Sequence, residues 1–200
     1  MKLYLASTNP GKLREFQLAG NDRGIIIDAV PRIQSLPACV EDGRTFEANA
    51  RKKAVHYAAY AGGPVFADDS GICVDALGGA PGVWSARYAG PKATDEDNNR
   101  KLMLELAEAA HSGRHPAHYL CVLALAEGSA VRMLVEGRVD GLLTEKPRGA
   151  NGFGYDPYFF YPPLGRTFAE LSSDAKFAVS HRGIAFRKLL DALSPVAEMQ

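Results

Sequence analysis

The stretch ADDSGICVDALGGAPGVWSARYAG, residues 67–90, combines acids, a hydroxyl and flexible glycines in a segment too short to build a core of its own. Two adjacent carboxylates, Asp68 and Asp69, are followed directly by Ser70. The apolar residues 65–67 before the acids predict a strand, and residues 72–76 after them predict a second, short strand. This composition indicates a functional site, to which other parts of the chain contribute.

The composition of the whole chain fits one globular domain without a separable linker. Its 200 residues, 46% of them apolar and 23% charged, can bury a real core. The 23 basic side chains balance the 23 acidic ones, so no overall field attracts nucleic acid or an anionic membrane. We find no signal peptide and no apolar run long enough to span a bilayer, and the three scattered cysteines fit reduced thiols. We therefore expect a cytoplasmic protein.

The polar loop STNPGK, residues 7–12, lies between a predicted short strand and a helix predicted from about Leu13. In such an arrangement, backbone N–H groups at the start of a helix point at an anion. Two interpretations of the loop remain open. Lys12 is either a phosphate ligand or a solvated lysine behind a helix cap made by Thr8 or Asn9.

Apolar periodicity elsewhere predicts a mixed sheet with helices, and therefore an α/β fold. Residues 45–61 form a predicted helix on which Asn49 and Lys53, four residues apart, point the same way. The alternative for this pair is a solvated helix face. Residues 117–126 and 130–139 predict two long strands joined by a hairpin turn, which makes that pair antiparallel.

A second glycine-rich segment, GANGFGYDP at residues 149–157, carries the aromatic Phe153 where a plain turn would be polar. Its glycines let the backbone approach a ligand closely. After it, Ser172 or Ser173 is predicted to cap a short helix that carries Lys176. The segment SHRG, residues 180–183, opens the last helix.

Charged residues in turns and at element ends define the chemistry that the chain can support. The cations are Lys12, Lys53, Lys176, Arg182 and Arg87, and the anions are Glu41, Asp68, Asp69, Asp75 and Asp156. Lysines beside glycine loops suit a polyphosphate, carboxylates suit Mg²⁺, and an aromatic flanked by glycines suits stacking on a base. A nucleoside triphosphate with magnesium uses all three, although a phosphate-binding α/β enzyme of another kind remains the broader interpretation.

The adjacent carboxylates also suit activation of water, because nearby like charges raise one pKa. Asp68 and Asp69 project to opposite sides of an extended backbone, so one of them faces the site directly. Their spacing does not decide which.

Five motifs resemble the XTP/dITP pyrophosphatase (inosine triphosphatase) family. They are STNPGK at 7–12, TFEANARKKA at 45–54, the stretch at 67–90, GFGYDPYF at 152–159 and SHRGIA at 180–185. Together they span nearly the whole chain in the family's order. The resemblance implies an elongated, two-lobed α/β homodimer with a mixed sheet and an active site in the cleft between the lobes. It also implies Mg²⁺-dependent hydrolysis of ITP, dITP and XTP to the monophosphate and pyrophosphate.

The resemblance also implies roles for individual residues. Asp69 is the expected general base, and Glu41 and Asp69 are the expected metal ligands. Expected to bind substrate are Ser7, Thr8, Asn9, Pro10, Gly11, Lys12, Asn49, Lys53, Asp68, Ser70, Phe153, Gly154, Tyr155, Asp156, Lys176, His181 and Arg182. Two alternatives are a Maf-like pyrophosphatase acting on other modified nucleotides and a nucleotide-binding module without activity.

Overall fold

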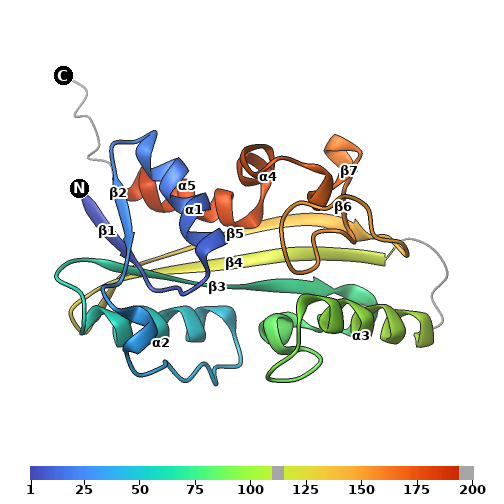
Figure 1. Cartoon of the computed structure of the whole chain (residues 1–200), viewed down its shortest axis with the longest axis horizontal. Helices are drawn as coiled ribbons and strands as arrows, with labels where there is room; N and C mark the ends of the chain where they lie inside the picture. Colours follow the sequence, from blue (N-terminus) through green and yellow to red (C-terminus); the bar gives the residue numbers. More distant parts are fainter. Residues whose placement is uncertain (110–114, 194–200) are drawn as a thin grey trace. The chain divides into compact units, whose positions relative to one another are not determined.

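The computed structural model describes residues 1–109 and 115–193, which form an α/β fold around one seven-stranded sheet (Figure 1). The strands are β1 (Lys2–Leu5), β2 (Ile26–Ala29), β3 (Val65–Val74), β4 (His115–Glu127), β5 (Ala130–Leu143), β6 (Phe159–Tyr161) and β7 (Arg166–Thr167). The helices are α1 (Pro10–Asn21), α2 (Phe46–Ala58), α3 (Asp95–Glu108), α4 (Ser173–Val179) and α5 (His181–Leu193).

The sheet is mixed, as the sequence predicts. Its strand order is β2-β1-β3-β4-β5-β6-β7, with β1 parallel to both β2 and β3 and with β6 antiparallel to β5 and β7. The predicted hairpin is present, because β4 and β5 are neighbours joined by a turn at residues 128 and 129. The α/β class is confirmed.

The chain divides into two compact units. Unit 1 comprises Met1–Asp69, Val122–Gly137 and Gly183–Gln200, and unit 2 comprises Ser70–Cys121 and Arg138–Arg182. In consequence β3, β4, β5 and α5 each contribute residues to both units.

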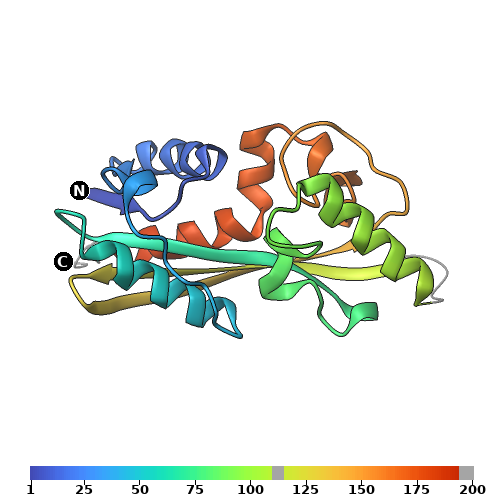
Figure 2. The same cartoon turned by 60° about the horizontal axis from the view of Figure 1, so that its bottom comes forward.

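In unit 1, helices cover both faces of the sheet. Figure 2 shows α1 and α5 on one side of β1 and β3, and α2 on the other. Three buried aromatic rings fix the first side: the ring centroid of Phe16 in α1 lies 5.1 Å from that of Phe66 and 4.8 Å from that of Phe186 in α5. Aromatic pairs at such distances stabilise a core beyond the area that they bury.

In unit 2, the segment after β5 packs through a second aromatic cluster. The ring centroid of Phe159 lies 4.6 Å from that of Tyr119 and 4.8 Å from that of Phe168. All three side chains are buried. The predicted cap of α4 by Ser172 is present, and Thr94 caps α3 within a full capping box.

Two boundary predictions are wrong. The first helix begins at Pro10 rather than near Leu13, because proline fits the first helical position and Asn9 caps it. The two strands predicted on either side of the acids are one continuous strand, β3. Polar residues interrupt its apolar pattern because β3 carries part of the candidate site, and the chain does not turn there.

Other predictions about the class of protein are also tested. Cys39, Cys73 and Cys121 are free thiols, as expected. Within residues 1–109 and 115–193, we find no helix with the length and apolar character needed to cross a membrane.

Candidate active site

The first polar loop caps α1 with its own side chains. Ser7 Oγ accepts a hydrogen bond from the N–H of Asn9 (3.2 Å), and Asn9 Oδ1 accepts from the N–H groups of Gly11 (2.8 Å) and Lys12 (3.2 Å). Lys12 is not solvated, since its Nζ lies 2.7 Å from Asp68 Oδ2 and its side chain is 19% exposed. The cap by Asn9 is therefore confirmed, whereas the solvated lysine is wrong.

β3 presents its two adjacent acids to opposite faces, as an extended backbone requires. Asp68 lies on the same side as Phe66 and reaches Lys12 of α1, with 1% of the residue exposed. Asp69 turns toward α2, where its Oδ2 accepts a hydrogen bond from Asn49 Nδ2 (3.0 Å). Because Asp68 is buried and paired with a lysine, Asp69 is the more accessible carboxylate of the two.

α2 delivers two side chains to the acids of β3. Lys53 Nζ lies 2.7 Å from Glu41 Oε2 and donates a hydrogen bond to the backbone oxygen of Asp68 (3.0 Å). Asn49, one turn earlier, is 1% exposed and reaches Asp69. The predicted common direction of Asn49 and Lys53 is confirmed, and the alternative of a solvated helix face is wrong.

The surroundings of Asp69 favour its protonated form more than water does. Burial raises the pKa of Asp69 to about 6, Glu41 and Asp68 add to this effect, and Lys53 and Asn49 oppose it. Burial lowers the pKa of Lys53, but the charges of Asp68 and Glu41 outweigh burial and leave that pKa raised. Asp69 is thus a carboxylate that takes up a proton near pH 6, close to a lysine that stays charged.

Unit 2 contains a second, deeper charge pair. Lys176 Nζ lies 2.6 Å from Asp156 Oδ2, and only 4% and 3% of the two side chains are exposed. Asp156 also accepts hydrogen bonds from the N–H of Phe153 (3.0 Å) and the hydroxyl of Tyr119 (3.4 Å). Burial raises the pKa of Asp156, and the charge of Lys176 counters it. Residue 152 must be glycine, because a Cβ there would lie 2.2 Å from Asp156 Oδ2.

The half-buried ring of Phe153 is surrounded by cations. Lys176 Nζ lies 4.5 Å and Arg182 Cζ 5.3 Å from its centroid, which are favourable cation–π distances. Arg182 also donates from Nη2 to Ser70 Oγ (3.2 Å). This arrangement joins Phe153, Ser70 and the start of α5, three parts of the chain that the sequence predicts to bind substrate.

The predicted site residues form one group in each unit. Unit 1 holds Ser7, Thr8, Asn9, Pro10, Gly11, Lys12, Glu41, Asn49, Lys53, Asp68 and Asp69, and unit 2 holds Ser70, Phe153, Gly154, Tyr155, Asp156, Lys176, His181 and Arg182. Two other charged candidates belong to unit 2 and make contacts with other residues. Asp75 is 65% exposed near His118, and Arg87 lies over the ring of Trp84.

Sequence reasoning missed several residues that support the group in unit 2. The ring of Tyr119 stacks on that of His181, with centroids 4.5 Å apart and planes 7° apart. Asp95 and Asn99 of α3 hydrogen-bond to the backbone of Gly154. In the sequence, Tyr119 is one apolar residue of a strand, and the two α3 residues belong to an ordinary polar helix start, so no local signal distinguishes them.

The acidic residues of unit 1 fit a metal that is held jointly with substrate. Mg²⁺ prefers one or two carboxylates, substrate phosphates and water to a cage of protein ligands. Glu41 and Asp69 could supply two such carboxylates, and the charge of Glu41 contributes to the raised pKa of Asp69. Across the part of the chain that the structure describes, no three His, Cys, Asp or Glu side chains are grouped to hold a metal alone.

The chain is an α/β protein whose mixed sheet carries lysine–carboxylate pairs near β3. Such an arrangement is typical of proteins that bind phosphate ligands. The model of the Ham1 family matches residues 3–192 of this chain. The chain therefore belongs to the Ham1 family, and the resemblance found in its motifs is confirmed.

Curated relatives and solved structures agree with this family. A dITP/XTP pyrophosphatase of Shouchella clausii is 45% identical over 98% of this chain and 98% of that protein, and one of Geobacter sulfurreducens is 45% identical over 96% of each. The structure of a Ham1 protein from Coxiella burnetii matches with a TM-score of 0.88 and 42% identity, covering 98% of this chain and all of that one.

Proposed function

We propose that this chain hydrolyses deaminated purine nucleoside triphosphates (ITP, dITP and XTP) to the nucleoside monophosphate and pyrophosphate. The observation that carries the proposal is the position of Asp69, a partly buried carboxylate with a pKa of about 6 beside Lys53. Full-length similarity to proteins named dITP/XTP pyrophosphatase supports the same reaction and substrate class.

Asp69 is the proposed general base. It takes the proton of the attacking water. The water oxygen bonds to the α-phosphorus as the bond from that phosphorus to the oxygen of the leaving pyrophosphate breaks. Asn49 donates to Oδ2 of Asp69 and so holds the carboxylate in one orientation. A base with a pKa near the working pH combines a useful ionised fraction with a sufficient affinity for the proton.

Lys12 and Lys53 are the proposed phosphate ligands. Lys12 is paired with the buried Asp68, and Lys53 with Glu41. A phosphate oxygen takes the place of Glu41 at Lys53, and at Lys12 it binds beside Asp68, because an ammonium group has three donors. Glu41, once released from Lys53, and Asp69 would hold Mg²⁺. The bound ion would lower the pKa of a water and neutralise phosphate charge. The lysines themselves orient the triphosphate.

Phe153 is the proposed platform for the purine base, with Arg182 and His181 as candidate donors to its 6-oxo group. A purine with a carbonyl at position 6 accepts a hydrogen bond where adenine presents an amine. A donor fixed at this position would face the adenine amine without an acceptor, so ATP would be rejected.

One assay tests the proposal against both alternatives. The protein is incubated with Mg²⁺ and each of ITP, dITP, XTP, dGTP and ATP, and pyrophosphate and orthophosphate are measured separately. We expect pyrophosphate from the first three only, since ATP lacks the 6-oxo group and dGTP, which has it, must be excluded through its 2-amino group. Hydrolysis of a different modified nucleotide in place of these would favour a Maf-like enzyme, and binding without any product would favour a silent nucleotide-binding module.

Three finer features belong to the same proposal. We expect Mg²⁺ to restore turnover after treatment with EDTA, and a homodimer to be found by light scattering coupled to size exclusion. We also expect the protein in the cytoplasmic fraction of its cell, where deaminated nucleotides would enter the nucleotide pool.

A further inference from the structure

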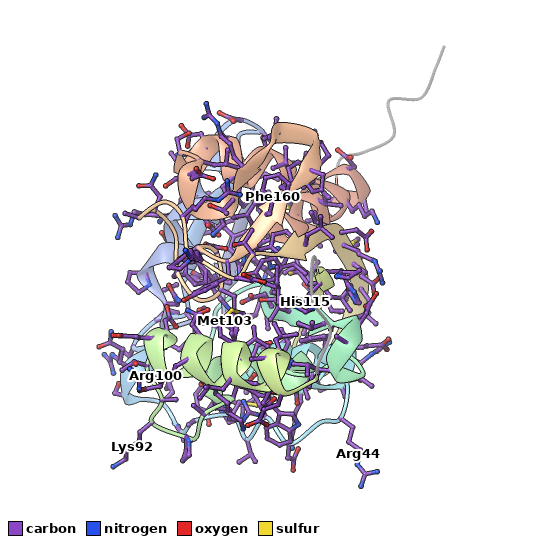
Figure 3. The ribbon with its side chains drawn as sticks, turned by 90° about the vertical axis from the view of Figure 1, so that its right-hand side faces the viewer. Arg44, Lys92, Arg100, Met103, His115 and Phe160 are labelled. Atoms are coloured by element: carbon purple, nitrogen blue, oxygen red, sulfur yellow. The ribbon has the colours of Figure 1, made fainter. Side chains whose placement is uncertain are left out.

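A groove of about 600 Å³ lies within unit 2, between α3 and residues 145–158. Asn99, Met103 and Leu104 line its α3 side, and Pro147, Phe153 and Pro157 line the other. Figure 3 shows Arg100 and Met103 projecting from α3, Met103 toward the segment that follows β5. The proposed base platform, Phe153, therefore faces across this groove a helix to which neither the motifs nor the relatives' names assign a role.

Two side chains of α3 hold one residue of this wall at both of its backbone polar groups. The N–H of Gly154 donates to Asp95 Oδ2 (2.6 Å), and the carbonyl of Gly154 accepts from Asn99 Nδ2 (2.9 Å). Asp95 and Asn99 are four residues apart and so lie on the same face of the helix. We name this pair of contacts the α3 clamp.

The orientation of the Asn99 amide is set by the clamp. Asn99 is 8% exposed, and its Nδ2 donates both to Gly154 O and to the backbone oxygen of Asp95. Its Oδ1 is buried and has no hydrogen-bond partner among residues 1–109 and 115–193. The reversed amide would place an oxygen against two carbonyls, so the observed orientation leaves one acceptor unused in order to hold Gly154.

The clamp acts on a loop that is fixed from its other side as well. Asp156 accepts from the N–H of Phe153, next to Gly154 in the chain. Phe153 is thus held between the α3 clamp and the buried Asp156–Lys176 pair, and Gly154 between them takes a positive φ of 61°. Neither contact involves the Phe153 ring, which lies near Lys176 and Arg182.

We propose that Asp95 and Asn99 are positioning residues that set the place of Phe153 for the purine base. This inference rests on the proposed function, because it assumes that Phe153 stacks on the substrate. Binding of the base then depends on two residues that touch no substrate. A merely structural clamp would change thermal stability and leave the Michaelis constant unchanged.

The test compares clamp variants with controls on the same turn of α3. Asp95→Ala and Asn99→Ala each remove one contact, and Asp95→Asn keeps an acceptor for the N–H of Gly154. Glu96→Gln alters a charge at the next position, where the side chain forms a 3.6 Å ion pair with Arg100. Asp97→Asn alters the capping box without touching the loop. Kinetics with ITP and inhibition by pyrophosphate are measured for each.

We expect the KM for ITP to rise about 10-fold in both alanine variants, the effect of losing one hydrogen bond to a charged or buried group. The kcat should change less than the KM, inhibition by pyrophosphate should stay as in the wild type, and Asp95→Asn should recover most of the affinity. An unchanged KM in folded alanine variants, or an equal rise in Glu96→Gln, would overturn the inference.

A second measurement needs no activity and separates the clamp from the proposed function. Hydrogen–deuterium exchange of peptides covering residues 149–158 should be faster in Asp95→Ala than in Asp97→Asn at matched thermal stability. Unchanged exchange in that segment overturns the clamp whatever the enzyme does. If the wild type releases no pyrophosphate from any of the nucleotides while exchange responds as expected, the proposed function fails and the role for base binding fails with it, but the clamp as a loop anchor stands.

Discussion

The two groups of charged residues in this chain differ in how deeply one lysine–carboxylate pair of each is buried. In unit 1, Lys53 and Glu41 are paired at 2.7 Å with 12% and 30% of their side chains exposed. In unit 2, Lys176 and Asp156 are paired at 2.6 Å with 4% and 3% exposed. Partly exposed pairs can exchange partners with a ligand, whereas a buried pair must stay intact because either charge alone would be costly.

This difference assigns different tasks to residues that look alike in the sequence. The lysines of unit 1 can bind phosphate oxygens and neutralise their charge. The lysine of unit 2 holds a loop together, since Asp156 also binds the N–H of Phe153. Substitutions in unit 1 should therefore affect turnover and binding, and substitutions of the buried pair should affect folding first.

The largest expected effect is the loss of turnover in Asp69→Asn. The amide of asparagine replaces a carboxylate that is both the proposed base and a proposed metal ligand. The kcat for ITP should therefore fall at least about 10³-fold. The measurement is pyrophosphate release under saturating ITP and Mg²⁺. Asp75→Asn is the matched control, because Asp75 belongs to the same stretch but is exposed near His118. Near-normal turnover by Asp69→Asn would contradict the assignment of the base.

The next effect tests the buried pair against the exposed one. Asp156→Asn leaves Lys176 buried without its counter-charge, and should lower the free energy of unfolding by about 3 kcal/mol. Glu41→Gln breaks the more exposed pair with Lys53, and should change the same quantity by less than about 1 kcal/mol. Urea denaturation of both variants measures the difference.

Equal losses in these two variants would contradict the contrast between the units. The double variant Lys176→Met with Asp156→Leu serves as a control for the pair. Removing both charges together should destabilise the protein less than Asp156→Asn does, although the hydrogen bond to Phe153 is also lost.

Local signals made much of the fold predictable. The strand before residue 7, the hairpin at residues 128 and 129, and the cap at Ser172 each depend on neighbouring residues, and the structure contains all of them. The continuity of β3 was missed, since three polar residues followed by a glycine in the middle of a strand resemble a turn in any local pattern. Their side chains are polar because α1, α2 and α5 bring partners to them from distant parts of the chain.

The candidate site was predictable in its residue types more than in its contacts. Lys12 and Asp68 stand out as charged residues beside a loop and a strand, but their ion pair exists only because α1 packs over β3. The contact of Asp95 with Gly154 joins residues 59 positions apart, and nothing in the local sequence of α3 indicates it. The roles of Asp69, Glu41 and the phosphate ligands remain predictions.

A third prediction concerns the stability cost of keeping Asp69 ionised. Its pKa in the folded protein is about 6, above the ordinary 3.8, so folded protein binds more protons between these values. Stability contributed by the protonated acid is present below pH 4 and is lost as pH rises through 6. A shift of this size corresponds to about 3 kcal/mol, and the partial exposure of Asp69 lowers the expected loss to about 2 kcal/mol.

Asp69→Asn removes this charge and should be more stable than the wild type by about 2 kcal/mol at pH 8, without metal. The difference should disappear below about pH 4, where both proteins carry a neutral side chain at this position. Thermal or urea unfolding in EDTA at several pH values measures it. A difference that is independent of pH would show that the effect comes from packing or hydrogen bonding and not from the charge.

The smallest effect tests whether the pairs in unit 1 can exchange partners. Lys12→Ala removes a proposed phosphate ligand, and should raise the KM for ITP about 10-fold, the effect of one charge-assisted hydrogen bond. Lys52→Ala is the control, because Lys52 lies on the same helix as Lys53 and forms an exposed ion pair with Asp42. If Lys12 serves only to neutralise the buried Asp68, its loss will lower the free energy of unfolding while the KM stays unchanged. A raised KM for ITP with unchanged inhibition by IMP, which lacks the β- and γ-phosphates, instead places Lys12 on the phosphates that leave as pyrophosphate.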